Sequence, residues 1–350
     1  MELRTLIFFV TSRCNAKCRT CFYWQELNHE GDLTFDEIDT LSATMPHFRE
    51  LWLSGGEPMM RSRLDEIVQL FYQRNRVRSI NLPVNGLFRD RLVRLMEFAT
   101  TELPELTVNI NVALDGFADT HDRIRGVPGN FDRAIQTIEA LYPVRERNPR
   151  IRIHVNSVIT AENIDQLEQL GWWLVEHTRL NGQYFQIVRG DPMDPTLKAV
   201  ESNRLRDFYQ AVKPIQEHYG RRLAERHGGG PKGWLERTLY RETLSFYHTI
   251  QHANLERSAR WPMPCSAGQS ILVIDYNGDV RACELRQKVA NLRDVACDFR
   301  RIFPSDAMRR ETGQIVRDQC WCTHVCFIHD STKSSRRARL YEIPLGRKLV

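Results

Sequence analysis

The chain has 350 residues, of which 42% are hydrophobic and 27% are charged, and its net charge is +5. This composition is that of an ordinary soluble protein, and it excludes collagen, wholesale disorder and a disulfide-stapled miniprotein. The longest apolar run near the start, residues 6–10, is far too short for a membrane helix, and no cleavage pattern follows it. We therefore expect a cytoplasmic protein with no transmembrane segment. The mild basic excess allows contact with an anionic substrate or, peripherally, a membrane surface, and it indicates no specific nucleic acid.

Short β-branched or aromatic runs alternate with longer helical patterns over the first half of the chain. The expected strands cover residues 3–10, 50–54, 79–84, 107–114, 151–158 and 184–188, and the expected helices cover residues 35–44, 64–75, 89–99, 130–141 and 163–178. Repeated βα units of this kind form a parallel sheet. We therefore expect an α/β fold, with a partial (β/α)6 TIM-like barrel over residues 1–190 and a site on the loops at the carboxyl ends of its strands. Thr34, with Glu37 three residues later, has the spacing of a helix capping box.

Two further parts are expected after the barrel. Residues 191–262 are basic, aromatic and mainly helical, which predicts a helical insertion or linker. Residues 263–330 are rich in Cys and contain a hairpin signal, residues 270–275 and 280–283 around Asn277-Gly278, so a small auxiliary domain is expected there. The last stretch, residues 331–350, is basic and is expected to be a peripheral tail.

The nine cysteines form two groups. In a cytosolic chain, close Cys spacing indicates metal or cluster ligation rather than disulfides. The first group, Cys14, Cys18 and Cys21, lies on a loop directly after the first expected strand. Three thiolates at this spacing can hold three irons of a four-iron, four-sulfur cube and leave the fourth iron without a protein ligand. The alternative is a zinc site with His29 as the nearby fourth ligand.

This cysteine loop, together with Ser54-Gly55-Gly56-Glu57-Pro58 after the second strand, resembles the radical S-adenosylmethionine superfamily. The resemblance implies that the three cysteines bind a 4Fe-4S cluster and that S-adenosylmethionine chelates its open iron. It also implies that the double-glycine segment and Glu57 hold the methionine amino group. The residues agree, because glycines allow close approach of a ligand to the main chain and a carboxylate suits an ammonium.

Further matches extend this resemblance over most of residues 3–190. It implies that Arg125 meets the cofactor carboxylate and that Asn156 contributes to cofactor binding. Two departures stand out. Ala113 replaces a usual Ser, for which Asn111 or Asn156 can compensate, and Thr20 replaces an aromatic residue before the third cysteine. The aromatic residues that follow are Phe22 and Tyr23.

The second cysteine group resembles the SPASM or twitch extension of the same superfamily. Cys265 is followed by Gly278 after twelve residues and by Cys283 after four more, a spacing in which a hairpin delivers two thiolates to an auxiliary cluster. The resemblance implies one 4Fe-4S cluster held by these two residues and by two of Cys320, Cys322 and Cys326, since the full seven-cysteine pattern is absent. His324 and the spare thiol leave a non-standard ligand open, and a zinc knuckle is the alternative. Cys297 stands alone and is expected to be a packed core thiol.

These patterns predict a radical S-adenosylmethionine oxidoreductase or maturase. It would cleave S-adenosylmethionine to a 5'-deoxyadenosyl radical, abstract hydrogen from an unactivated C–H bond, and take electrons from a reductant such as flavodoxin or ferredoxin. The auxiliary cluster would support substrate oxidation or radical bond formation. The alternatives are a peptide or protein maturase of the same superfamily and a non-catalytic iron–sulfur or zinc sensor or scaffold.

The sequence does not identify a catalytic acid or base. Candidates for the pocket lie near the expected strand ends, and they are Asp115, Tyr184, Gln186, Arg189 and Asp191. The first strand begins near the start of the chain and leaves no room for a leader-binding domain. The helical segment interleaves aromatic residues with Arg and His and can cover the barrel mouth, although its helices can equally pack their aromatic side on the barrel. We therefore expect a small or lipid-linked metabolite as substrate rather than a peptide.

Overall fold

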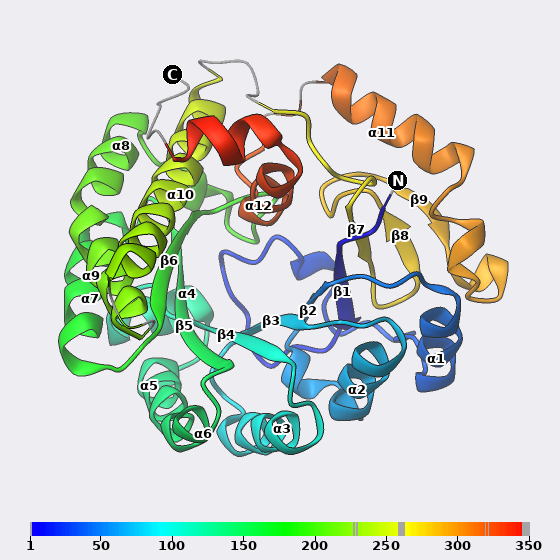
Figure 1. Cartoon of the computed structure of the whole chain (residues 1–350), viewed down its shortest axis with the longest axis horizontal. Coiled ribbons are helices and arrows are strands. Elements are labelled where there is room, and N and C mark those ends of the chain that lie inside the picture. The colour runs from blue at the N-terminus through cyan, green and yellow to red at the C-terminus, as the bar shows by residue number, and fades with distance from the viewer. Residues whose placement is uncertain are drawn as a thin grey trace.

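Six parallel strands form a partial barrel (Figure 1). The computed structural model describes residues 2–226, 228, 230–257, 263–318, 320 and 322–344. The strands are β1 (Thr5–Thr11), β2 (Glu50–Gly55), β3 (Ser79–Val84), β4 (Thr107–Ala113), β5 (Ile151–Ile159) and β6 (Gly182–Ile187). They pair in chain order, each parallel to the next. The six expected strands are therefore confirmed, with ends shifted by a few residues.

Alternation of residue types along the strands explains the two faces of this sheet. In β4, Val108, Ile110 and Val112 are buried toward the helices, whereas Asn109 and Asn111 alternate with them and are only partly buried. Successive side chains of a strand point to opposite faces, so the amides project into the barrel. The face of β4 toward the barrel interior is consequently polar at these two positions.

Helices cover the outer face of the sheet. They are α1 (Phe35–Thr44), α2 (Leu64–Arg74), α3 (Arg89–Glu102), α4 (Ala118–Arg125), α5 (Asn130–Ala140), α6 (Tyr142–Arg147) and α7 (Ile164–His177). The five expected helices are confirmed, and the short helices α4 and α6 are additional. The capping box at the start of α1 is also present, since the Thr34 side chain accepts from the Glu37 N–H and the Glu37 side chain accepts from the Thr34 N–H.

The C-terminal hairpin extends the barrel sheet. Its strands are β7 (Ile271–Ile274), β8 (Asp279–Arg281) and a third strand, β9 (Lys288–Asn291). β7 pairs in parallel with β1, and β8 and β9 follow in antiparallel order. The sequence predicted the hairpin within a separate small domain, whereas the structure joins its first strand to the barrel. The four residues of β7 are all buried, as a strand between two neighbours in a sheet requires.

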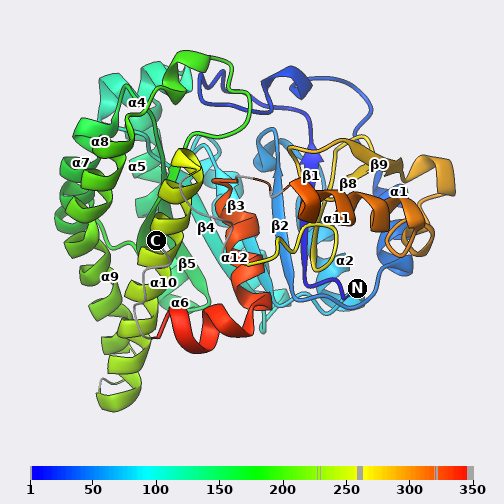
Figure 2. The ribbon, with the colours of Figure 1, turned by 90° about the horizontal axis from the view of Figure 1, so that it is seen from above.

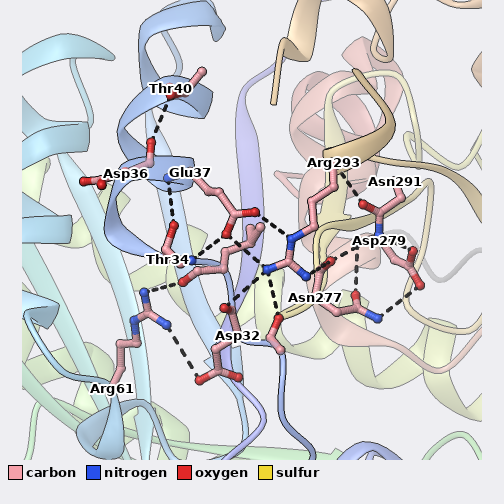
Figure 3. A network of polar contacts seen from close by, with 12 residues as sticks. Asp32, Thr34, Asp36, Glu37, Thr40, Arg61, Asn277, Asp279, Asn291 and Arg293 are labelled. Atoms are coloured by element: carbon pink, nitrogen blue, oxygen red, sulfur yellow. Dashed lines mark hydrogen bonds and ion pairs between the residues drawn. The ribbon is translucent and has the colours of Figure 1, made fainter. Parts of the chain in front are cut away.

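A polar network holds this hairpin to the start of α1 (Figure 3). Arg293, just after β9, donates to both carboxylate oxygens of Glu37, at 2.6 and 3.1 Å, and to the Gly31 carbonyl at 3.2 Å. Arg61 donates to the Leu33 carbonyl at 2.6 Å in the same region. Residues from both ends of the chain are therefore fixed against each other beside β1.

The remaining helices follow β6 and the hairpin. They are α8 (Ser202–Ala211), α9 (Lys213–Arg226), α10 (Gly230–Glu256), α11 (Asp306–Asp318) and α12 (Val325–Ser334). The helical character expected after residue 190 is confirmed, and α11 and α12 are additional. Figures 1 and 2 show α10 and α12 side by side across the opening between β6 and β7. These two helices close the side of the barrel that the strands leave open.

A second apolar core binds α10 to the end of the described chain. It contains Tyr247 and Ile250 of α10, Ile328 of α12, and Ala338 and Ile343 beyond α12. α12 continues past residue 330, where the sequence placed the start of the tail, and its Ser331 and Thr332 are buried. Residues 345–350 of the expected tail lie outside the described residues. Across the described chain, no helix combines the length and apolarity that a bilayer crossing needs.

Candidate active site

A cavity of about 910 Å³ occupies the barrel interior. Its wall is formed by the inward residues of β2 to β6, the loop after β1, and one side each of α10 and α12. Of the residues selected from the sequence, the following line it: Cys14, Cys18, Cys21, Gly55, Gly56, Glu57, Asn111, Ala113, Arg125, Asn156, Tyr184, Gln186, Arg189 and Cys326. His29 and Asp191 are exposed on loops outside this lining, and Asp115 is buried behind it.

The loop with the first three cysteines, residues 12–21, is anchored at its start. The Asp32 carboxylate accepts from the Ser12 N–H at 2.9 Å and from the Thr11 hydroxyl at 2.5 Å. Asn28 accepts from the Cys14 N–H at 3.0 Å. Asp32 also lies 3.7 Å from Arg61, within the network of Figure 3. Asp32 thus connects the cysteine loop to the segment before α1, which Arg293 contacts from the hairpin.

The other end of the cysteine loop is bound to α4. The N–H of Lys17 donates to the Arg125 carbonyl at 3.2 Å, and that of Arg19 to the Ile124 carbonyl at 2.8 Å. Gly126 ends the helix with φ of +65°, and a Cβ built on it would lie 2.7 Å from the Lys17 carbonyl oxygen. A glycine is therefore required both by the left-handed turn and by the close approach of the cysteine loop.

Arg125 projects from the end of α4 toward the thiols. Its Nη2 lies 2.8 Å from Asp115 Oδ2, and its Nη1 lies 3.7 Å from the Cys18 Sγ. Burial alone would lower the pKa of Arg125, but the Asp115 carboxylate and the Cys18 thiol raise it above its usual value. The structure therefore places Arg125, with 12% of its side chain exposed, beside the three cysteines as a fixed cation.

Gly55 and Gly56 approach the backbone of the cysteine loop. A Cβ on Gly55 would lie 2.4 Å from the Thr11 carbonyl oxygen, and one on Gly56 would lie 2.2 Å from that of Arg13. The Gly56 N–H donates to the Thr11 carbonyl at 2.8 Å, and the Glu57 N–H to the Arg13 carbonyl at 2.8 Å. Because Gly55 and Gly56 have no side chains, their backbone can pack directly against the cysteine loop. The sequence had predicted only that these glycines let a ligand approach the main chain.

The Glu57 carboxylate is buried and already bound on both oxygens. Oε2 accepts from the Asn85 N–H at 2.8 Å, and Oε1 accepts from the Met59 N–H at 3.1 Å. Burial raises the pKa of Glu57 to about 7, although these two hydrogen bonds oppose the shift. Pro58 opens the short helix η2 (Pro58–Met60) and fixes the backbone that carries this side chain. Glu57 thus joins the ends of β2 and β3 at the cavity wall.

A second layer of amides, not identified from the sequence, supports these groups. Asn85 donates to the Asn15 side chain at 2.7 Å and, through its carbonyl, accepts from Asn130 at 2.9 Å. Asn130 in turn contacts Nε2 of His121, whose Nδ1 accepts from the Asp115 N–H at 3.0 Å. Burial lowers the pKa of His121 to about 4, so the ring is neutral. The partners of Asn85 come from the cysteine loop, the segment after β2 and the start of α5, which are far apart in the sequence.

Asn156 belongs to a chain of side chains that leads toward the second cysteine group. Gln186 donates to its Oδ1 at 2.8 Å, and Arg189 donates to Gln186 Oε1 at 3.3 Å. Arg189 also donates to the Glu284 carboxylate at 3.0 Å. The Asn156 side chain is therefore held by another side chain, and Gln186 and Arg189 connect the barrel to the residue after Cys283.

The second cysteine group gathers beside α12. Cys322 interacts electrostatically with Cys265, Cys283 and Cys320, and burial raises the pKa of each of the four thiols. Cys320 lies on the exposed side of this set, and Cys326 lies on the cavity side, near Arg189 and Glu284. Nε2 of the buried His324 is 3.0 Å from Glu284 Oε1. Cys297 is elsewhere, buried in the main core, so its expected packing role is confirmed.

The thiols suit clusters better than a single ion. Among the described residues, no three or more Cys, His, Asp or Glu side chains converge closely enough for one metal ion. In a four-iron cube each thiolate binds a different iron, so the thiolates need not converge on one point. The first loop offers three cavity-lining thiols beside the Arg125 cation, and this donor set fits a cluster with one iron free of protein ligands.

Comparisons with known proteins agree with this geometry. The family model described as the Radical SAM superfamily matches residues 8–170. A solved structure of anSMEcpe with bound AdoMet and a peptide superimposes with a TM-score of 0.64 at 14% identity, over 97% of this chain and 88% of that chain. Streptococcus suis SuiB superimposes with a TM-score of 0.55 at 14% identity, over 91% of this chain and 65% of that one. At this identity, the structural likeness shows the fold alone.

Curated relatives have several activities. Fe-coproporphyrin III synthase of Methanosarcina barkeri is 28% identical, over 79% of this chain and 67% of that protein. A probable GTP 3',8-cyclase of Methanococcus maripaludis is 26% identical, over 56% of this chain and 62% of the relative. Pre-heme d1 synthase of Dinoroseobacter shibae is 25% identical, over 47% of this chain. The chain spans 39 to 67% of the lengths of these three relatives.

The fold and the cysteine loop define an enzyme that binds an iron–sulfur cluster at the mouth of a partial barrel. The family match is narrower, because residues 8–170 match the radical S-adenosylmethionine superfamily. S-adenosylmethionine and a 4Fe-4S cluster are the cofactors of this class of enzyme.

Proposed function

We propose that this protein is a radical S-adenosylmethionine oxidoreductase or maturase that acts on a small or lipid-linked metabolite. The observation that carries the proposal is that the three thiols of the first loop, the Gly55-Gly56-Glu57 segment and Arg125 all line one cavity. S-adenosylmethionine bound at such a cluster supplies, on one-electron reduction, a 5'-deoxyadenosyl radical able to remove hydrogen from an unactivated carbon. The electron would come from a reductant such as flavodoxin or ferredoxin.

The residues at the mouth of the cavity have distinct roles in this proposal. Cys14, Cys18 and Cys21 would hold the cluster. Arg125, kept charged by Asp115, supplies a cation for the cofactor carboxylate, and Asn156 is fixed by Gln186 as a hydrogen-bonding group on the adjoining wall. Glu57 positions the loops after β2 and β3 through its two backbone contacts. Its carboxylate also lines the cavity, so it can still accept from the methionine ammonium.

The second thiol group supports an auxiliary cluster. We assign Cys265, Cys283 and Cys322 to it, because Cys322 interacts with both of the other thiols. The remaining thiol is Cys320, which also interacts with Cys322, or Cys326, which shares Glu284 as a neighbour with Cys322 and Cys283. The Arg189–Glu284 pair places this group next to the barrel interior. A second redox centre next to the cavity would favour substrate oxidation or radical bond formation over isomerisation.

The enclosure of the cavity favours a small molecule over a peptide. α10 and α12 cover the side that the strands leave open, and their side chains form part of the cavity wall. A wall on that side restricts the access of water to a reactive intermediate and limits the size of the group that enters. The names of three relatives, an Fe-coproporphyrin synthase, a GTP cyclase and a pre-heme synthase, are those of enzymes for small molecules. The alternative is a peptide or protein maturase of the same superfamily.

Anaerobic incubation with dithionite and S-adenosylmethionine, followed by chromatography for 5'-deoxyadenosine, tests the proposal. We expect the reconstituted protein to form this product. A protein that holds its full complement of iron and forms none would instead be a sensor or scaffold. Stimulation of the product by metabolite or lipid fractions, and not by peptides with a leader, tests the substrate class.

A further inference from the structure

One row of inward side chains crosses the barrel at a distance from the cysteine loop. Pairing in register places Trp52 of β2 beside Asn81 of β3, Asn81 beside Asn109 of β4, and Asn109 beside Arg152 of β5. All four residues line the cavity. Neighbouring strands are about 4.8 Å apart, so an indole, two amides and a guanidinium stand side by side on one face. We call these four residues the Arg152 row.

Arg152 differs from the other basic residues of the cavity wall. Arg125 is paired with Asp115, Arg189 with Glu284, and Lys333 with Glu50. Arg152 makes no ion pair within the part of the chain that the structure describes, and the side chain of Asn81 has no hydrogen bond there. The cavity thus contains one guanidinium whose charge is not used by the protein, beside an amide with free donors and an acceptor.

The acidic residues of the cavity wall do not pair with Arg152. Glu50 is bound to Lys333 and also accepts from the Trp52 indole N–H at 3.3 Å. Glu236 of α10 already has an interaction partner. Arg152 is an exposed residue of β5 and also lines the cavity, so solvent and ligand can both reach it. The guanidinium of Arg152 is therefore open to an anionic ligand.

The row is separated from the cofactor end of the cavity. Arg152 and Asn156 are four residues apart on the same face of β5, which corresponds to about 13 Å along the strand. α10 contributes Leu239, Tyr240, Leu244 and Tyr247 to the cavity wall, next to the polar side chains of Glu236, Thr243, His248 and Gln251. A ligand that reaches from one level to the other would therefore have an apolar body and a polar end.

We propose that the Arg152 row binds an anionic oxygen group, a carboxylate or a phosphate, at the far end of the substrate while the apolar body of the substrate lies against α10. A guanidinium binds both groups through a fork of two hydrogen bonds, and a neighbouring amide adds a donor. The inference rests on the proposed function, because it assigns the substrate of that same cavity to anionic, partly apolar small molecules.

Two probes separate the sources of the anion. Coproporphyrin III carries carboxylates on a planar apolar body, and GTP carries phosphates. Binding of each to the reconstituted full-length protein with S-adenosylmethionine, without reductant, is measured by fluorescence titration for the porphyrin and by calorimetry for GTP. We expect at least one probe to bind and Arg152→Gln to raise its dissociation constant by about tenfold or more, since hydrogen bonds to a charged group are lost. Arg152→Lys should have a smaller effect because the charge remains.

The chain offers a matched control. Arg150 is exposed, precedes β5 and does not line the cavity, so Arg150→Gln removes the same charge without changing the row. Its affinity for the probes should equal that of the wild type. Asn81→Ala tests the same row independently, and we expect weaker binding without a change in the thermal unfolding temperature. The methyl ester of coproporphyrin III should bind equally to wild type and Arg152→Gln.

The outcomes are distinct. The proposal is overturned if neither probe binds the wild type, or if Arg152→Gln and Arg150→Gln have the same affinity for the probe that binds. Formation of 5'-deoxyadenosine is measured separately. If this product forms but Arg152 does not affect binding, the inference fails and the proposed function stands. If binding depends on Arg152 but no product forms with a full cluster, the proposed function fails and the anion site stands.

Discussion

Arg125 Nη1 lies 3.7 Å from the Cys18 Sγ, although the two residues are 107 positions apart in the chain. The same guanidinium is held by Asp115, which follows β4 and accepts from the Val158 N–H of β5 at 2.7 Å. The charge beside the thiols is therefore fixed by two strands and a helix. An anionic cluster with its thiolates would be stabilised by this cation, since burial is the largest of the causes that raise the pKa of Cys14 to about 12 and of Cys21 to about 11.

Removal of the first three thiols separates the two proposed clusters. We expect the triple change of Cys14, Cys18 and Cys21 to Ala to lose about half of the iron, because one of two cubes would be absent. It should form no 5'-deoxyadenosine. Iron analysis and chromatography of the anaerobically reconstituted protein measure both. Product formation by the triple variant would mean that another site cleaves the cofactor.

Gly126→Ala should displace the cysteine loop. The new methyl group would lie 2.7 Å from the Lys17 carbonyl, and the left-handed φ adds roughly 1 kcal/mol of strain. Gly129→Ala is a matched control, because Gly129 also has a positive φ, of +69°, but its nearest neighbour is a flexible Arg133 atom at 3.9 Å. We expect Gly126→Ala to lose iron from the first cluster and Gly129→Ala to retain it. Equal iron in the two variants would contradict the steric role of Gly126.

Loss of an auxiliary thiol should uncouple cofactor cleavage from substrate turnover. Cys265→Ala and Cys283→Ala remove side chains beside Cys322 and leave the loop after β1 unchanged. We expect substrate-independent formation of 5'-deoxyadenosine to persist in part and substrate conversion to stop. The comparison is made between variants with the thermal unfolding temperature of the wild type. Retained conversion would show that the second thiol group is structural.

His121 should make the stability of the fold depend on pH. Burial lowers its pKa from 6.5 to about 4, so the folded state favours the neutral ring, which accepts from the Asp115 N–H. This contribution, on the order of 3 kcal/mol, is fully present above pH 6.5 and is lost as the pH falls toward 4. Urea unfolding of wild type and His121→Gln at pH 7.5 and 5 measures it. The free energy of unfolding should fall less with pH in the variant, and parallel profiles would refute the assignment.

Glu57 should matter for stability as well as for the cofactor. Glu57→Ala would leave the N–H groups of Asn85 and Met59 without their acceptor, at about 1 to 3 kcal/mol each when buried. Glu57→Gln keeps one acceptor oxygen and should lose less. Thermal unfolding without cofactor measures the effect of each variant on stability. Equilibrium binding of S-adenosylmethionine then measures its effect on cofactor affinity. If both variants unfolded like the wild type, the structural role of Glu57 would be excluded.

Local patterns were enough to predict a large part of the molecule. The six barrel strands, the capping box at Thr34, the hairpin around Asn277-Gly278 and the cysteine spacing all depend on residues close in sequence, where periodicity and turn chemistry act directly. The short polar helix α4 and the helix α12 were not predicted. α12 is stabilised by packing against α10. The helix propensity of single residues carries no information about such a tertiary contact.

The sequence by itself indicated which chemistry this protein can hold, because the spacing of three thiols on one short loop suits an iron–sulfur cluster. Only the tertiary structure decided that β7 joins β1, that α10 and α12 close the barrel, and that Arg125 meets Cys18. It also decided that Asn81, Asn109 and Arg152, which no motif unites, stand in one row. Such contacts join residues far apart in the chain, and their geometry follows from strand register and from burial of apolar faces, which act on the whole fold at once.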